Sequence, residues 1–269
     1  MNSEHCLLAV LAHPDDESFG MGGTLALYAQ RGVEVHLICA TRGEVGETPP
    51  DFERNDRSIA ELRMDELRCA GQILGLKKVH FLKYRDSGMP GSDDNSHPRA
   101  LAAAPMEQVA KEIAGLIRKL KPQVVLTFDP FGGYGHPDHI AIQRATERAF
   151  HLAGEQTPLD SLPPYQSQKL YFHTFPNRSL RVLVRLLSLF GKDPRKWGRN
   201  DDIDLVKITE HTYPVHARID FRSVAKLKEQ ASACHKSQLI PGASGFIWSI
   251  MRLLSGPESF MRAHPPGKP

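Results

Sequence analysis

"LLAVLAHPDDES", residues 7–18, decides the fold, because a run of six apolar residues passes directly into a histidine and acidic side chains. Four more short apolar runs have the same strand-like character, at 33–40, 78–82, 123–128 and 169–175. Helical patterns alternate with these runs, at 18–32, 56–76, 105–120 and 138–150. Continuous apolar strands separated by helices are typical of a parallel sheet covered on both faces. The sequence therefore predicts an α/β fold, a doubly wound, mainly parallel sheet with helices on both faces.

The chain has 269 residues, enough for one large domain with a substantial core. Beyond residue 176 the alternation loosens, and two further helices are predicted, at 178–192 and 221–239. The first is basic and amphipathic, and we expect it to be a solvated or interface helix rather than one that lies on a membrane. We therefore expect a single domain over 1–269, with 176–269 as a C-terminal extension of helices and loops.

Charge and composition exclude several classes of protein. The net charge is only +3, and Lys and Arg are interspersed with acids, so nucleic acid is not expected as a partner. No apolar run reaches about 18 residues, which argues against stable membrane insertion, and the N-terminus lacks the basic start of a signal peptide. Homo-oligomers remain compatible with the sequence.

The cysteines indicate a reducing compartment. They are far apart and include no CxxC pair, so a disulfide framework is not expected: Cys6, Cys39, Cys69 and Cys234. Most lie in apolar segments, where we interpret them as small core residues. The predicted localisation is cytoplasmic.

Ligands of a doubly wound fold bind at the carboxyl ends of its strands. "HPDDE" follows the first predicted strand, "TRGEVGE" (41–47) the second, and "DPFGGYGHPDH" (129–139) the fourth. After the third strand, "KYRDSGMPGSDDNSHPRA" is expected to be a plain loop. The functional crevice is therefore predicted at the carboxyl ends of the first, second and fourth strands.

Two of these segments have the spacing of a metal site. His13 and Asp16, three residues apart, could close on one ion, while His136 and His139 offer a third ligand and a spare. Catalytic zinc typically has three protein ligands and an open position for water. The competing interpretation is that these histidines only cap helices or pack in the core.

More acidic groups are present than three ligands require. Asp15 or Glu17 could accept a proton from a metal-activated water. Asp138, between the two histidines, could orient an imidazole or could cap the helix that begins there.

Together these motifs resemble the PIG-L/LmbE-like family of metal-dependent N-acetylglucosaminyl deacetylases. The resemblance covers most of the chain, and its carriers occur in the expected order: "AHPDDE" (12–17), "TRGEVGE" (41–47), "IAELRMDELRCAGQILG" (59–75), "DPFGGYGHPDH" (129–139) and "HKSQL" (235–239). The pair "AHPDDE" and "GHPDH" is far more specific than either motif alone.

The resemblance implies roles that spacing leaves open. It implies that His13, Asp16 and His139 hold the metal and that Asp15 is the general base. It implies that His136 stabilises the oxyanion or protonates the leaving amine, and that Asp138 tunes His136 or its neighbour.

Further residues are weaker candidates. Tyr134 is a candidate second donor to the oxyanion. Arg63 matches the arginine of the helix motif and is expected to contact substrate, although it could be an ordinary surface charge. Arg42 and Glu44 are also expected near substrate. His235 could support the wall of the site or could be purely structural.

The predicted function is hydrolysis of the N-acetyl group of an N-acetylglucosamine-type sugar or sugar conjugate, with Zn²⁺ as cofactor, although Fe²⁺ can occupy such a site. One alternative is a non-haem iron oxygenase, because two histidines and one carboxylate also form its facial triad. Another is a catalytically inactive sugar-binding protein. The acid–base groups Asp15 and His136 favour hydrolysis over oxygen activation.

Overall fold

The computed structural model describes residues 5–49, 52–156, 158–159, 161–174, 177–197, 201–239 and 256–266. Within these ranges one sheet contains seven strands in the order β3-β2-β1-β4-β5-β7-β6. Their bounds are β1 Cys6–Leu11, β2 Glu34–Cys39, β3 Lys78–Phe81, β4 Val124–Phe128, β5 Lys169–Thr174, β6 Ala217–Ile219 and β7 Glu258–His264. All five strands predicted from apolar runs are present.

The first five strands are mutually parallel, and β7 and β6 add an antiparallel edge. This confirms the α/β prediction. The C-terminal extension contains more than the expected helices and loops, since it supplies both antiparallel strands. Strand β7 carries Glu258, Ser259 and Arg262 and pairs with the distant β5, so no continuous apolar run marks it in the sequence.

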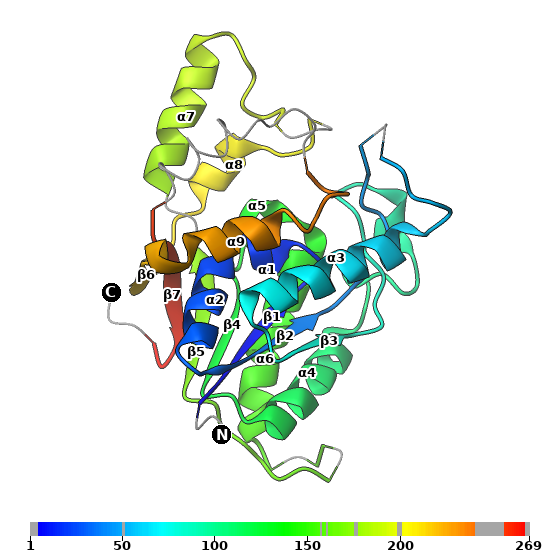
Figure 1. The fold of residues 1–269 in the computed structure, drawn as a ribbon, viewed down its shortest axis with the longest axis vertical. Helices are drawn as coiled ribbons and strands as arrows, with labels where there is room; N and C mark the ends of the chain where they lie inside the picture. Colours follow the sequence, from blue (N-terminus) through cyan, green and yellow to red (C-terminus); the bar gives the residue numbers. More distant parts are fainter. Residues whose placement is uncertain are drawn as a thin grey trace.

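Helices cover both faces of the sheet, as predicted. Around β1 and β2 lie α1 Asp16–Phe19, α2 Gly22–Gln30, α3 Ile59–Leu74 and α9 Ala225–Ser232 (Figure 1). The opposite face carries α4 Met106–Leu120 and α6 Pro137–Gly154, which pack against each other. The short α5 Gly132–Gly135, α7 Asn177–Leu189 and α8 Leu205–Glu210 lie at the carboxyl end of the strands, in the upper part of Figure 1.

Local sequence explains where the longer helices begin and end. Ser58 and Glu61 form a capping box at the start of α3, and Gly75 ends it with a left-handed φ of 75°. The helix predicted over 18–32 is divided into α1 and α2. The helix predicted over 221–239 is shorter, a 3₁₀ turn at Arg222–Val224 followed by α9.

The order of the strands positions the site. Strand β1 is the centre of the core, with Leu8, Ala9 and Val10 completely buried. It pairs with β2 on one side and β4 on the other, so the direction of winding reverses between β1 and β4. The polar segments after these two strands therefore meet at the switch point, the usual ligand site of this architecture.

One cysteine prediction is wrong. Cys69 on α3 and Cys234, just after α9, form a disulfide, although 165 residues separate them. No sequence spacing indicates this pair, because only the packing of α3 against α9 brings the two residues together. Cysteine usage therefore no longer supports the inference of a reducing compartment. No helix in the described part of the chain is long and apolar enough to span a bilayer.

Candidate metal centre

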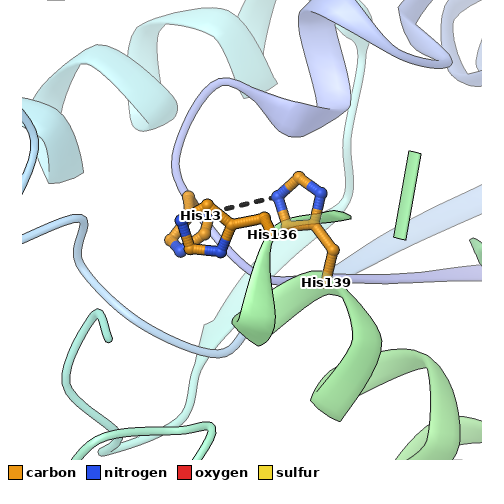
Figure 2. A group of neighbouring side chains, drawn as sticks. All are labelled: His13, His136 and His139. Carbon is orange, nitrogen blue, oxygen red and sulfur yellow. Dashed lines mark hydrogen bonds between the residues drawn. The ribbon is translucent and has the colours of Figure 1, made fainter. Parts of the chain in front are cut away.

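The imidazoles predicted as ligands converge at the switch point. His13 lies two residues beyond β1, His136 immediately precedes α6, and His139 lies in its first turn. All three are buried, and their rings lie close together (Figure 2), with those of His13 and His136 edge-on to each other. The sheet thus assembles one polar cluster from segments more than 120 residues apart in the sequence.

Ligand atoms of three residues in this cluster have the spacing of a metal site. His13 Nδ1 lies 3.2 Å from His139 Nε2, which lies 3.2 Å from an oxygen of Asp16. The other oxygen of Asp16 is 3.6 Å from His13 Nδ1. Tetrahedral ligands at the usual zinc distances are about 3.3 Å apart. The residues His13, Asp16 and His139 therefore fit a small divalent ion.

On both histidine rings, the nitrogen that is not a candidate ligand also has a hydrogen-bond partner, which strengthens this fit. His13 Nε2 lies 3.0 Å from Asp138 Oδ2, and His139 Nδ1 lies 3.1 Å from the carbonyl oxygen of Gly132. These acceptors require protons on the outer nitrogens, so in the neutral rings the inner nitrogens present two lone pairs to each other. A cation between them removes that repulsion. Carboxylate and carbonyl partners of this kind are typical of metal-bound histidines.

The carboxylates around His13 also favour a cation. Burial alone would lower the pKa of His13, but Asp86 and Asp138 hold it well above its usual value. A positive charge at this position, supplied by a proton or by a metal ion, is therefore stabilised by the surrounding carboxylates.

His136 is placed differently from the other two histidines. Its Nδ1 accepts the backbone N–H of Asp138 at 3.2 Å and so caps α6. Burial and the neighbouring imidazoles His13 and His139 hold the pKa of His136 well below its usual value. The neutral ring must then carry its proton on Nε2, and His136 lines the adjacent pocket. Its nitrogens also lie close enough to those of His13 and His139 for an alternative three-histidine site.

Asp15 occupies an unusual backbone conformation next to the ligand set. Its φ of 115° and ψ of −29° are rare for a residue with a side chain. Arg63, reaching across from α3, donates to Asp15 Oδ2 at 3.0 Å and to the carbonyl oxygen of Pro14 at 2.7 Å. Burial raises the pKa of Asp15 to about 6, while the charge of Arg63 opposes that rise. Asp15 is thus a carboxylate whose pKa suits exchange of a proton near neutral pH.

The sequence predicted a plain loop after β3, and this prediction is wrong. Its Asp86 is buried and lies 3.4 Å from His13 Nε2, and the backbone N–H of Ser87 donates to Asp138 Oδ2 at 2.9 Å. The hydroxyl of Ser87 also donates to the Asp138 carboxylate. The signal that could have found these residues is their position, since Asp86 and Ser87 follow the carboxyl end of a parallel strand, β3.

Of the interpretations left open for Asp138, the contact with an imidazole is the one present, and the imidazole is that of His13 rather than His136. The carboxylate of Asp138 contacts His13 and Ser87, whereas only its backbone N–H reaches His136. The helix geometry explains the difference, because the capping His136 lies outside the first turn and Asp138 projects from that turn toward β1.

A pocket of about 330 Å³ opens beside these groups. Its described lining includes His13, Asp15, Arg63, Asp86, Tyr134, His136, Asp202 and Gln238. Burial, together with Asp16 and Asp15, holds the pKa of Tyr134 well above its usual value, so its hydroxyl keeps its proton.

Two predicted substrate contacts lie elsewhere in the same region. Neither Arg42 nor Glu44 is among the described residues that line the pocket. The Glu44 carboxylate instead accepts the backbone N–H groups of Arg42 at 3.2 Å and of Asp86 at 3.0 Å. Glu44 therefore ties the loop after β2 to the loop after β3.

Two deacetylases of bacteria are similar in sequence to this protein over nearly the whole chain. A deacetylase of Thermobifida fusca, 1D-myo-inositol 2-acetamido-2-deoxy-alpha-D-glucopyranoside deacetylase, is 36% identical over 273 residues, which cover 97% of this chain and 93% of that protein. A protein of Catenulispora acidiphila with the same name and the number 2 is 35% identical over 274 residues, covering 96% and 88%.

Solved structures agree on the fold. The N,N'-diacetylchitobiose deacetylase from Pyrococcus horikoshii superposes with a TM-score of 0.66 at 22% identity, covering 96% of this chain and 83% of that one. The sequence model of the PIG-L family, described as GlcNAc-PI de-N-acetylase, matches residues 8–150, more than half of the chain. These matches confirm the resemblance drawn from the motifs: the chain belongs to the PIG-L family of deacetylases.

Proposed function

We propose that this chain is a metal-dependent N-deacetylase that hydrolyses the acetamide of an N-acetylglucosamine conjugate. The observation that carries the proposal is the convergence of ligand atoms from three residues, with pairwise distances of 3.2–3.6 Å, beside the half-buried carboxylate of Asp15. Metal-assisted amide hydrolysis needs these components together, an ion and an adjacent base. The relatives named above are deacetylases, which supports the same reaction for this chain.

The proposed substrate is N-acetylglucosamine linked to an inositol. Both named relatives act, by their names, on a 1D-myo-inositol 2-acetamido-2-deoxy-α-D-glucopyranoside, and each aligns over nearly the whole of this chain. The pocket lining supports a polyhydroxylated ligand, because it includes Asp86, Ser92, Asp202 and Gln238.

His13, Asp16 and His139 would hold the ion. A bound divalent ion, Zn²⁺ or Fe²⁺, would supply polarisation of a carbonyl and a lowered pKa, near 7, for a water molecule. Asp138 and Asp86 orient His13, and the Gly132 carbonyl orients His139. Both rings therefore already have the orientation that metal binding would require.

Asp15 acts as the general base. In this role its carboxylate accepts a proton from the attacking water, and its pKa of about 6 keeps it ionised at neutral pH. Once protonated, the same side chain can give that proton to the departing amine. Arg63 holds the carboxylate from the side of α3.

His136 acts as a hydrogen-bond donor to the oxyanion. Because its Nδ1 accepts the backbone N–H of Asp138, the neutral ring carries a proton on Nε2. A donor fixed by a helix cap needs little reorganisation as negative charge develops on the carbonyl oxygen. The hydroxyl of Tyr134, another residue of the pocket lining, is the second donor in this proposal.

An acetate-release assay tests the proposal. Purified enzyme is incubated with N-acetylglucosaminyl inositol, N-acetylglucosaminyl malate and diacetylchitobiose, and with metal-stripped enzyme as control. We expect acetate and a free amine, fastest from the inositol conjugate, and none without metal. Release of acetate under anaerobic conditions rules out the oxygenase alternative. Failure to release acetate from every conjugate by the metal-loaded enzyme contradicts the proposed function.

A further inference from the structure

Glu17 and His235 form a completely buried ion pair behind the candidate base. His235 Nε2 lies 2.7 Å from Glu17 Oε1, and both side chains have an exposed fraction of 0%. The two residues are 218 positions apart. Neither is one of the ligand atoms at the metal centre or part of the described pocket lining. A buried charge pair of this kind is costly to desolvate, so its retention calls for a specific role.

The second carboxylate oxygen of Glu17 indicates that role. Glu17 Oε2 accepts the backbone N–H of Asp15 at 3.0 Å. This is the residue with the φ of 115°, a strained conformation for a residue with a side chain, which persists only when surrounding contacts hold it. The Asp15 peptide determines where its carboxylate points, so a bond to that peptide controls the direction of the base.

His235 keeps Glu17 in place. Its pKa is raised, because the charge of Glu17 outweighs the lowering effect of burial, so His235 can donate a charged hydrogen bond. The turn that carries His235 is itself anchored to α3. Glu66 on that helix accepts the backbone N–H and the hydroxyl of Ser237, both at 2.7 Å, and the disulfide at Cys234 lies next to His235.

We propose that the Glu17–His235 pair is a positioning device for Asp15. Glu17 holds the Asp15 peptide in its left-handed conformation, and His235 fixes Glu17 to the turn after α9. Arg63, also on α3, contacts the Asp15 carboxylate itself. Helix α3 therefore supports the backbone of Asp15 indirectly, through the turn that carries His235, and contacts its carboxylate directly through Arg63. The inference rests on the proposed function, in which Asp15 takes the proton.

Glu17→Ala tests the positioning of Asp15. The variant removes the acceptor of the Asp15 N–H, and we expect kcat for acetate release to fall about 10²-fold, as for a base misplaced by about 1 Å. KM and bound metal should stay unchanged. Glu17→Gln should recover most of the loss, because its amide oxygen can still accept that N–H. An unchanged kcat in Glu17→Ala overturns the proposal.

A double-mutant cycle separates positioning from general damage. If Glu17 acts through Asp15, Glu17→Ala should cause no further loss of kcat in an Asp15→Asn background. Equal losses in both backgrounds overturn the proposal. The matched control is Glu258→Ala, which removes another buried, cation-paired carboxylate that accepts backbone N–H groups, those of Gly23 and Thr24. It should lower thermal stability and leave kcat unchanged.

His235 provides a second test, which also applies if Glu17→Ala does not fold. His235→Ala should lower kcat at constant KM, whereas His235→Gln, which retains an N–H donor, should restore it. A folded His235→Ala enzyme with wild-type kcat contradicts the proposal. These outcomes are distinct from failure of the proposed function, in which the wild-type enzyme itself releases no acetate.

Discussion

Arg63→Gln should move the acidic limb of the pH–rate profile to higher pH. Asp15 must be ionised to accept a proton, so kcat/KM rises as the pH passes upward through its pKa of about 6. Arg63, whose side chain is only 5% exposed, lies 3.0 Å from the Asp15 carboxylate and lowers that pKa. A neighbouring arginine typically lowers a carboxyl pKa by about 1–3 units. Removing the charge of Arg63 should therefore shift the midpoint of the acidic limb to higher pH by about 1–3 units.

The assay is acetate release at low substrate concentration between pH 5 and about 9, a range that spans the expected shift. At pH 7 the variant should be much slower than the wild type, and at the upper end most of the difference should disappear. Arg63→Lys, which keeps a positive charge, is the matched control and should leave the limb near its original position. A uniform loss at every pH with an increased KM would refute this reasoning and would support the substrate-binding role that the sequence suggested for Arg63.

Four further outcomes are expected. Asp15→Asn should keep its metal and lose about 10²–10⁴ in kcat, measured by metal analysis beside acetate release; loss of the metal would identify Asp15 as a ligand. His139→Ala should abolish stoichiometric zinc binding in equilibrium dialysis, and retention of tight binding would favour another ligand set. Asp138→Asn should weaken zinc binding about 10–100-fold through its contact with His13, whereas unchanged affinity would remove Asp138 from the support of the site. Cys69→Ser should lower the free energy of unfolding by about 2–4 kcal/mol in a denaturant titration under oxidising conditions, and an unchanged midpoint would contradict a stabilising disulfide.

The parallel part of the fold was predictable from sequence, because each buried strand is a continuous apolar run. The proposed ligand triad could be predicted for a related reason. His13 and Asp16 follow β1, and His139 follows β4, so the architecture alone directs both segments to the switch point. Periodicity and position were sufficient for these features.

Other features depend on contacts that no local pattern encodes. The Cys69–Cys234 disulfide requires α3 and α9 to pack side by side, and Asp86 becomes part of the site only because the loop after β3 reaches His13 at the end of β1. The partner of Asp138 depends on the side from which α6 presents its first turn. Antiparallel β7 was missed because its polar residues give it no distinctive run.

The pocket draws its walls from two parts of the chain, one inside and one outside the span matched by the family model. The groups proposed for bond cleavage lie within residues 8–150, the span shared with the family model, whereas Asp202 and Gln238 border the same pocket from outside that span. Substitutions at this outer rim can change which alcohol or sugar is tolerated beyond the acetamide, while the chemistry at the strand ends is left intact. New specificities can therefore be engineered by substituting these two rim residues, while His235 and the groups at the strand ends stay unchanged.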